Sequence, residues 1–203
     1  MPVLVSMIMS YLFGSIPFGY LIVRGKSGGD VRQTGSGGTG ATNVSRSAGK
    51  AAGVATLVLD ALKGAAAVGL AKWLLVNVEY GPWWIGACGI VAMLGHIFPI
   101  WLRFRGGKGV ATGVGIFAVL APLAVLAAGV LFVIVMWLSR YVSLASMIAA
   151  ASIPIFVWLQ SLVRPAPNAW PNIVSSLLGA ALIIYAHRTN VSRLLSNTEN
   201  KFH

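Results

Sequence analysis

The sequence predicts an all-α polytopic membrane protein of seven transmembrane helices, with its N-terminus outside and its C-terminus in the cytoplasm. Of the 203 residues, 57% are hydrophobic and only 9% are charged, whereas soluble domains carry about 25% charged residues. The basic residues gather in the breaks between apolar runs, as they do in cytoplasmic loops of membrane proteins. We expect residues 1–203 to form a single transmembrane domain.

Apolar runs follow one another along the chain, and about 20 apolar residues span a bilayer as a helix. The first run, Met1–Val23, is loosened in its second half by Gly14, Pro17 and Gly19. The later runs are Ala51–Val78, Pro82–Leu102, Gly109–Leu138, Tyr141–Val163 and Asn172–Ala186, and a Pro-rich turn at Arg164–Pro171 precedes the last one.

The number of crossings depends on Gly109–Leu138. As one helix this run is about 45 Å long and the chain crosses six times. As two short helices of about 14 residues, hinged near Pro122, it gives seven crossings, although such helices are short for the bilayer core. With seven crossings, every Lys and Arg except Lys63, Lys72 and Arg164 lies in segments that share one face. The positive-inside rule therefore favours seven.

The net charge of +11 is typical of basic loops that face anionic headgroups. We therefore expect no nucleic-acid partner, and a basic pocket for an anionic substrate is the more specific interpretation. The one cysteine, Cys88, lies inside an apolar run and leaves no intrachain disulfide. No carboxylates that suit a metal ion lie beside the basic loops, so we expect neither a metal nor a cofactor.

The first candidate site is the segment Gly35–Arg46, which has four glycines in its first six residues. Such a backbone turns tightly, and successive N–H groups in a turn can form a nest for an anion. An arginine matches phosphate with two donors. The alternative is a flexible linker, which would not need these donors after its glycines. The candidate residues are Ser36, Gly37, Thr42, Asn43 and Arg46.

The second candidate site surrounds Lys108. Its glycines, its lysine and the later Thr112 resemble the ingredients of a P-loop, but the spacing and the preceding strand of that motif are missing. N–H groups at the start of a helix from Val110 can still face an anion. The alternative is a positive-inside loop with a capping glycine. The candidate residues are Arg105, Gly106, Gly107, Lys108 and Gly109, while His96 is interpreted as a packed residue.

The third candidate site is His187 with Asn190, which share a face if the last helix continues. Histidine can accept a proton near neutral pH. The alternative for this segment is that Arg188 and Arg193 merely anchor the chain on the positive side, which we favour for Arg193.

Two further polar features lie in or beside the apolar runs. Asp60 and Lys63 are three residues apart within a span, and we expect them to pair with each other rather than to face a cavity. Ser143 either caps the following helix, which is the simpler interpretation, or donates to a substrate phosphate.

These segments resemble the bacterial membrane-bound glycerol-3-phosphate acyltransferases that use acyl phosphate as donor. The resemblance runs from Phe13 to Glu199 and is most specific where Gly95–Pro99 leads into Phe104–Thr112. It implies a multi-pass protein of the cell inner membrane whose active site faces the cytoplasm. The implied reaction moves an acyl group from acyl phosphate to the 1-hydroxyl of glycerol 3-phosphate. The products are lysophosphatidic acid and inorganic phosphate, in the first committed step of phospholipid synthesis.

The resemblance also implies roles for single residues. The family's essential residues fall on Ser36, Arg46, His187 and Asn190, its glycerol-3-phosphate motif falls on Arg105–Gly109 with Lys108, and its structural glutamate falls on Glu199. The implied partners are glycerol 3-phosphate, acyl phosphate, membrane lipid and an upstream soluble enzyme that forms acyl phosphate. Two departures, Gly38 where the family favours Asn and Asn197 where it favours Gly, bear on fine substrate positioning.

The proton acceptor of this reaction has two candidates. The leaving group is inorganic phosphate, so positioning and charge stabilisation are the main tasks. Either His187 or a phosphate oxygen of the donor takes the proton. The signature of a His followed by an Asp (H-x4-D) is missing, which favours the phosphate oxygen. Other function classes are a membrane transporter of phosphate esters, whose loops lie at mid-bilayer, and a nucleotide-binding protein that needs magnesium.

Overall fold

The computed structural model describes residues 1–165 and 169–202, and in these ranges the chain forms helices without strands. The Pro-rich turn expected at Arg164–Pro171 lies partly outside the described residues. The chain divides into two compact units, Met1–Ile116 and Phe117–His203, here called unit 1 and unit 2.

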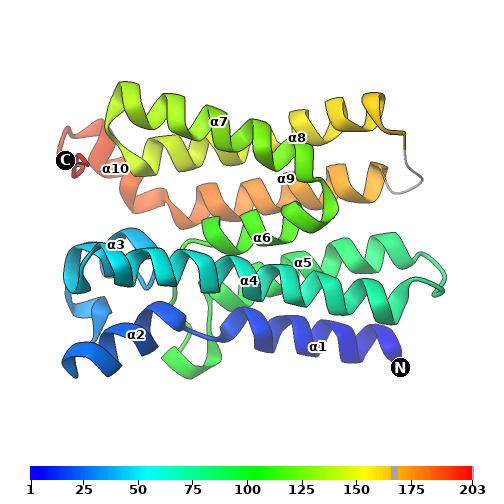
Figure 1. The fold of residues 1–203 in the computed structure, drawn as a ribbon, viewed down its shortest axis with the longest axis horizontal. Helices are drawn as coiled ribbons and strands as arrows, with labels where there is room; N and C mark the ends of the chain where they lie inside the picture. Colours follow the sequence, from blue (N-terminus) through cyan, green and yellow to red (C-terminus); the bar gives the residue numbers. More distant parts are fainter. Residues whose placement is uncertain (166–168, 203) are drawn as a thin grey trace. The chain divides into compact units, whose positions relative to one another are not determined.

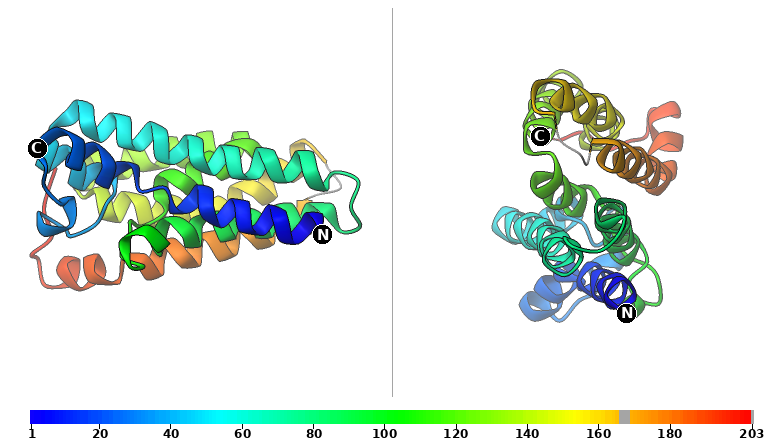
Figure 2. Two further views of the ribbon diagram at one scale, coloured as in Figure 1. Left: turned by 90° about the horizontal axis from the view of Figure 1, so that it is seen from below. Right: turned by 90° about the vertical axis from the view of Figure 1, so that its right-hand side faces the viewer.

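Unit 1 is built on three long helices that contact one another, α1 (Pro2–Ser15), α4 (Lys50–Leu75) and α5 (Gly81–Ile97) (Figure 1). Seen end-on in the right-hand view of Figure 2, their axes run side by side. Glycines allow the close approach, because a Cβ on Gly14 of α1 would strike the backbone of Ala92 on α5. Small residues at helix contacts are the usual means of packing inside a bilayer.

Shorter elements of unit 1 lie at the ends of the predicted apolar runs and between them. Helix α2 (Phe18–Ser27) begins within the first run, and the 3-10 turn η2 (Ile100–Leu102) ends the run Pro82–Leu102. The 3-10 turn η1 (Val31–Gln33) and α3 (Ala41–Ala48) form where the sequence suggested only a loop. The break between α1 and α2 falls at Ile16 and Pro17, inside the apolar run that the sequence marked as loosened.

Unit 2 contains α7 (Pro122–Ser139), α8 (Val142–Val163), α9 (Ala169–Ala186) and α10 (Arg188–Leu195). Helix α8 contacts both α7 and α9. Large apolar side chains such as Leu126 and Trp137 on α7 are exposed, as expected for a helix that faces lipid.

Six helical segments among the described residues are long and apolar enough to cross a membrane. A further apolar helix, α6 (Val110–Leu120), has 11 residues and is therefore only about 16 Å long. The protein is thus an all-helical, multi-pass membrane protein. Seven crossings and the orientation of the chain remain predictions.

The predicted hinge near Pro122 is confirmed, because α6 ends at Leu120 and α7 begins at Pro122. Both sides of the break find side-chain partners within unit 2. Asn172 Nδ2 donates to the Leu120 carbonyl at 3.2 Å, and Gln160 Oε1 accepts from the Ala124 N–H at 3.1 Å. A break in a membrane helix is tolerated when its freed backbone groups are satisfied in this way.

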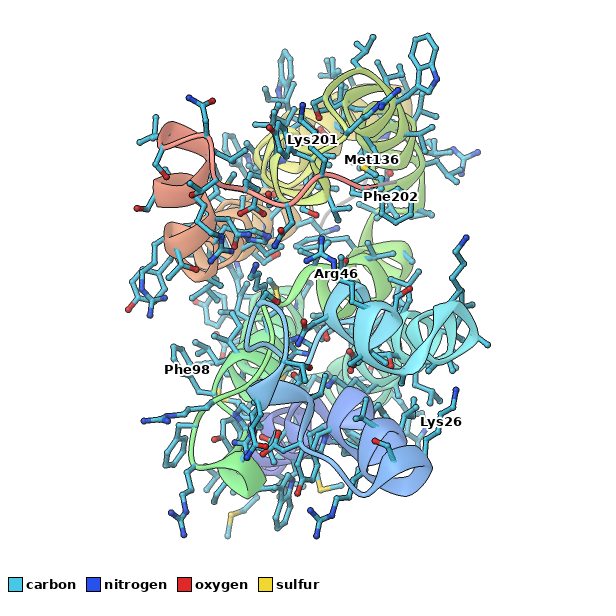
Figure 3. All side chains as sticks on the ribbon, turned by 90° about the vertical axis from the view of Figure 1, so that its left-hand side faces the viewer. Lys26, Arg46, Phe98, Met136, Lys201 and Phe202 are labelled. Atoms are coloured by element: carbon cyan, nitrogen blue, oxygen red, sulfur yellow. The ribbon has the colours of Figure 1, made fainter. Side chains whose placement is uncertain are left out.

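The basic segments adjoin one another within each unit. In unit 1, Arg32 Nη1 donates to the Leu102 carbonyl at 3.0 Å and joins the first basic segment to the second. In unit 2, the Phe202 N–H donates to the Arg140 carbonyl at 2.8 Å and joins the C-terminal tail to the α7–α8 turn. Figure 3 labels Phe202 on that tail. Each unit thus brings two of its basic segments together, and the shared face of all of them stays a prediction.

The predicted pairing of Asp60 with Lys63 is confirmed. Lys63 Nζ lies 2.7 Å from Asp60 Oδ1, and the two side chains are 3% and 2% exposed respectively. Lys63 Nζ also donates to the Ile16 carbonyl at 2.7 Å. That carbonyl lies at the break between α1 and α2, so the buried pair also supports the interrupted first helix.

Replacing Lys63 by Met is expected to destabilise unit 1 by about 3 kcal/mol, because it leaves Asp60 buried without its cation. Lys72→Met is the matched control, since Lys72 is an exposed lysine of the same helix. The thermal midpoint in detergent measures the effect. Equal midpoints for the two variants would contradict a stabilising role for the pair.

Candidate functional site

The first glycine loop, residues 34–40, is organised by the buried side chain of Asn43. Its Oδ1 accepts from the Ser36 N–H at 3.0 Å. Its Nδ2 lies 2.9 Å from the Val31 carbonyl, 3.0 Å from that of Thr34 and 2.8 Å from that of Gly38. The loop therefore closes around one amide. This replaces the prediction that Asn43 donates to a substrate phosphate, because its donors are engaged by the loop itself.

Apolar side chains pack beneath this loop. Val23, Val31 and Val44 form a buried cluster that brings α2, η1 and α3 together. Lys26 Nζ donates to the Ala48 carbonyl at 2.7 Å and closes the C-terminal end of α3. These contacts fix the direction of α3 and thereby of Arg46, which is exposed on its last turn (Figure 3).

Arg32 is a further ordering residue that the sequence did not single out. Its guanidinium forms an ion pair with Asp30 at 2.6 Å and lies 5.5 Å from the centre of the Tyr20 ring. Hydrogen bonding from Arg32 lowers the pKa of Asp30 below its ordinary value, against the opposing effect of burial. The opposite charges two residues apart were the available signal, but they did not reveal the bond from Arg32 to Leu102.

The second glycine loop, Arg105–Gly109, folds back onto the end of α5. The Gly106 N–H donates to the Ile97 carbonyl at 3.1 Å, and the Gly107 N–H donates to the His96 carbonyl at 3.1 Å. In the first loop, the Gly37 N–H likewise donates to the Thr34 carbonyl at 3.1 Å. The expected nest of glycine N–H groups is therefore used within the protein at these positions.

The other polar groups that flank the two loops in unit 1 are mainly side chains and helix starts. Ser36 and Arg105 are exposed, and Thr42 and Lys108 are half-buried. Gly109 takes a left-handed backbone with φ +82°, which lets the chain turn directly into α6. The N–H groups at the start of α6 thus stay next to Lys108 in sequence, as the second motif predicted.

The two glycine loops approach each other closely. A Cβ built on Gly38 would lie 3.8 Å from the Gly106 carbonyl oxygen, which is an ordinary van der Waals distance. The structure therefore brings the first and second predicted motifs together within unit 1. A Cβ at position 38 would make only ordinary contacts.

In unit 2 the candidate residues gather on Glu199. Its Oε1 accepts from Ser143 Oγ at 2.8 Å and from Asn190 Nδ2 at 2.7 Å, and its Oε2 accepts from Arg193 Nε at 2.7 Å. The capping alternative for Ser143 is wrong, because the N-cap of α8 is Tyr141 and Ser143 lies inside the helix. Arg193 is likewise more than a positive-side anchor, since it pairs with a largely buried carboxylate.

His187 lies at the junction of α9 and α10, so the helix does not continue as expected, but the chain still places Asn190 one turn later. Both side chains are buried, and the Asn190 N–H donates to the His187 carbonyl at 2.8 Å. His187 Nδ1 lies 2.8 Å from the Ile183 carbonyl. A carbonyl only accepts, so Nδ1 carries the proton and Nε2 is the basic nitrogen of the neutral ring.

The second departure from the family pattern has a backbone explanation. Asn197 has φ +56°, in the left-handed region. Glycine adopts this region freely, and Asn is among the few other residues that do so readily. Asn197 therefore keeps the turn that brings Glu199 back to α8 and α10.

Replacing Asn43 by Ala is expected to speed exchange of the Ser36 amide roughly tenfold, because the hydrogen bond from this N–H to Asn43 Oδ1 contributes about 1 kcal/mol. Hydrogen exchange followed by mass spectrometry measures the Ser36 and Gly37 amides. Ser47→Ala is the control, since the Ser47 hydroxyl bonds only carbonyls of its own helix in the described contacts. An unchanged exchange rate in Asn43→Ala would show that the loop does not depend on this amide.

Glu199→Gln is expected to lower stability at pH 7 by about 1 kcal/mol, since a charged acceptor is lost. Burial tends to raise the pKa of Glu199, but hydrogen bonds from Arg193, Asn190 and Ser143 outweigh it and lower the pKa below 4.5. The stabilisation is therefore complete above the unfolded value and disappears as the pH falls through the folded pKa.

Thermal midpoints of the wild type and Glu199→Gln should accordingly differ at pH 7 and converge once the pH falls below the lowered pKa of Glu199. Glu79→Gln removes an exposed carboxylate and should give no such pH-dependent difference. A gap between the wild type and Glu199→Gln that persists undiminished in acid would contradict the role of the carboxylate charge.

Known proteins match this chain over the segments that carry these motifs. The sequence model of the family described as glycerol-3-phosphate acyltransferase matches residues 4–197. The glycerol-3-phosphate acyltransferase of Syntrophotalea carbinolica is 44% identical over 199 residues, which are 98% of this chain and 96% of the relative. That of Geotalea daltonii is 45% identical over 199 residues, which are 98% of this chain and 97% of the relative.

Solved structures agree with the sequence comparison. PlsY, an integral membrane glycerol 3-phosphate acyltransferase crystallised in its glycerol 3-phosphate form, is 36% identical, with a TM-score of 0.88 over 100% of this chain and 96% of that chain. Its lysophosphatidic acid form gives a TM-score of 0.84 with the same coverage. The match of the family model over nearly the whole length, with relatives above 40% identity, places this chain in the glycerol-3-phosphate acyltransferase family.

Proposed function

We propose that the protein transfers an acyl group from acyl phosphate to the 1-hydroxyl of glycerol 3-phosphate, releasing lysophosphatidic acid and inorganic phosphate. The observation that carries the proposal is the close approach of the two glycine loops at Gly38 and Gly106. Each loop has a basic residue beside it, Arg46 on α3 and Lys108 before α6. Two substrates that both carry phosphate suit two adjacent basic loops.

The residues of unit 1 bind and orient phosphate in this proposal. Arg46 and Lys108 supply positive charge, the Ser36 hydroxyl donates a hydrogen bond, and the start of α6 supplies backbone N–H groups. Gly106, Gly107 and Asn43 act indirectly, because their polar groups hold the loops in shape. The set of phosphate-contacting residues is completed by Thr42, Arg105 and Gly109.

The residues of unit 2 serve the acyl transfer. Asn190 and Ser143 are held by Glu199, so we assign Glu199 a structural role. Ser143 donates its one hydroxyl proton to Glu199 and supports the site, and Asn190 has the task of orienting a phosphate or the acyl carbonyl. The bond from His187 to Ile183 is to a backbone carbonyl and not to the carboxylate that orients the usual catalytic histidine. This favours a phosphate oxygen of the donor as proton acceptor, with His187 as a binding residue.

The proposal includes a membrane topology for the chain. Because α6 and α7 are separate helices, the chain can turn back at Pro122 and cross seven times. The short α6 then requires local thinning of the bilayer or shelter by neighbouring helices. The basic segments and the C-terminus lie in the cytoplasm in this arrangement, where a soluble enzyme can deliver acyl phosphate to the inner membrane.

The protein purified in detergent is expected to convert acyl phosphate and glycerol 3-phosphate into lysophosphatidic acid and an equal amount of inorganic phosphate, without ATP or magnesium. Arg46→Ala should lower kcat/KM for glycerol 3-phosphate about 100-fold, because a charge-assisted hydrogen bond is lost. Lys50→Ala, a nearby exposed lysine, should change it little. Glycerol 3-phosphate crossing vesicles without acyl transfer would instead identify a transporter.

The proton acceptor is tested at His187. If a phosphate oxygen takes the proton, His187→Ala should weaken substrate binding and leave measurable turnover at saturating substrate. Binding is measured by calorimetry and turnover by phosphate release. Abolished turnover with unchanged binding of both substrates would make His187 the general base.

A further inference from the structure

A buried charged cluster of unit 1 has no part in the proposed reaction. Asp60, Lys63 and His96 are all at least 95% buried, and they come from the middle of α4 and the last turn of α5. His96 Nδ1 lies 3.7 Å from Asp60 Oδ1, on the same oxygen that Lys63 approaches at 2.7 Å. Ionisable groups inside a membrane span are expensive and usually serve a function.

The other edge of the His96 ring faces the second glycine loop. A Cβ on Gly107 would collide with this ring, and its three nearest atoms would be Nε2, Cε1 and Cδ2 of His96. The His96 carbonyl also accepts the Gly107 N–H at 3.1 Å. His96 therefore touches Gly107 through both its ring and its backbone, directly before Lys108 in the chain.

We infer that the His96 ring, packed between Asp60 and Gly107, is a positioning residue for the second glycine loop, and that this ring sets where Lys108 presents its charge to the substrate phosphate. An ion pair needed only to neutralise Asp60 would be complete with Lys63. The ring adds a rigid surface on which Gly107 packs, and rigid support of this kind is what precise binding sites require. The inference rests on the proposed function. It assigns to His96 and Asp60 the role of supporting the proposed phosphate site from behind.

The chain offers a complementation test. In Gly107→Ala the new methyl group collides with the ring, so the KM for glycerol 3-phosphate should rise roughly tenfold or more, as displaced binding groups do. His96→Ala should raise the same KM less, because the loop loses its support without being pushed. In the double variant the methyl group enters the vacated space, so its KM should match that of His96→Ala alone.

Gly106→Ala is the matched control. A Cβ on Gly106 would meet the His96 carbonyl oxygen and the Pro99 ring, and both remain when the His96 side chain is removed. Combining Gly106→Ala with His96→Ala should therefore multiply the two KM effects. The inference would be overturned if the KM effects also multiplied when Gly107→Ala is combined with His96→Ala, as they should for Gly106→Ala with His96→Ala.

Asp60→Asn tests the contact of the His96 ring with Asp60, on the edge of the ring opposite Gly107. It should raise the KM in the wild-type background and leave it unchanged in the His96→Ala background, because it acts through the ring. An equal rise in both backgrounds would contradict the inference. For every variant, kcat should change less than KM, and a variant whose thermal midpoint falls while its KM stays at the wild-type value shows a merely structural role.

Thermal midpoints of the same variants give a readout that needs no substrate. His96→Ala should suppress the destabilisation by Gly107→Ala and not that by Gly106→Ala. A wild-type protein without acyl transfer would overturn the proposed function while this packing result still stands. An active wild type with no suppression in either KM or midpoint would overturn the positioning role alone.

Discussion

The constraint on which this structure depends is that backbone polar groups inside a bilayer need partners within the protein. The chain interrupts its helices inside apolar runs, and at each break side chains replace the missing helical bonds. Lys63 reaches the Ile16 carbonyl at the first break. Asn172 and Gln160 serve the two sides of the second. A few buried polar side chains thus permit a shape that uninterrupted helices could not take.

The same rule governs the loops. Glycines let the backbone turn, and the turns then bond to themselves, to α5 or to Asn43, so that the N–H groups of Ser36, Gly37, Gly106 and Gly107 are used within the protein. These bonds fix the shape of the two loops. The loops therefore give Arg46 and Lys108, which lie beside them, a defined place.

The sequence revealed the features that depend on local pattern. Apolar runs showed the long helices, Pro122 showed the hinge, and a spacing of three residues showed the pair of Asp60 and Lys63. Features that depend on distant contacts were not visible. Nothing local indicates that Arg32 bonds to Leu102, or that Ser143 meets Glu199 far along the chain. Helix α3 was missed because its glycine-rich approach has the composition of a loop.

The amide of Asn43 has a chemical consequence of its own. Aspartate has nearly the same size and shape and would fill the same space. It would, however, present an oxygen where the Nδ2 group now faces the carbonyl oxygens of Val31, Thr34 and Gly38, and like polarities repel. The loop therefore distinguishes two isosteric side chains by the sign of their partial charges, so at this position shape alone is a poor guide to which substitutions the protein can accept.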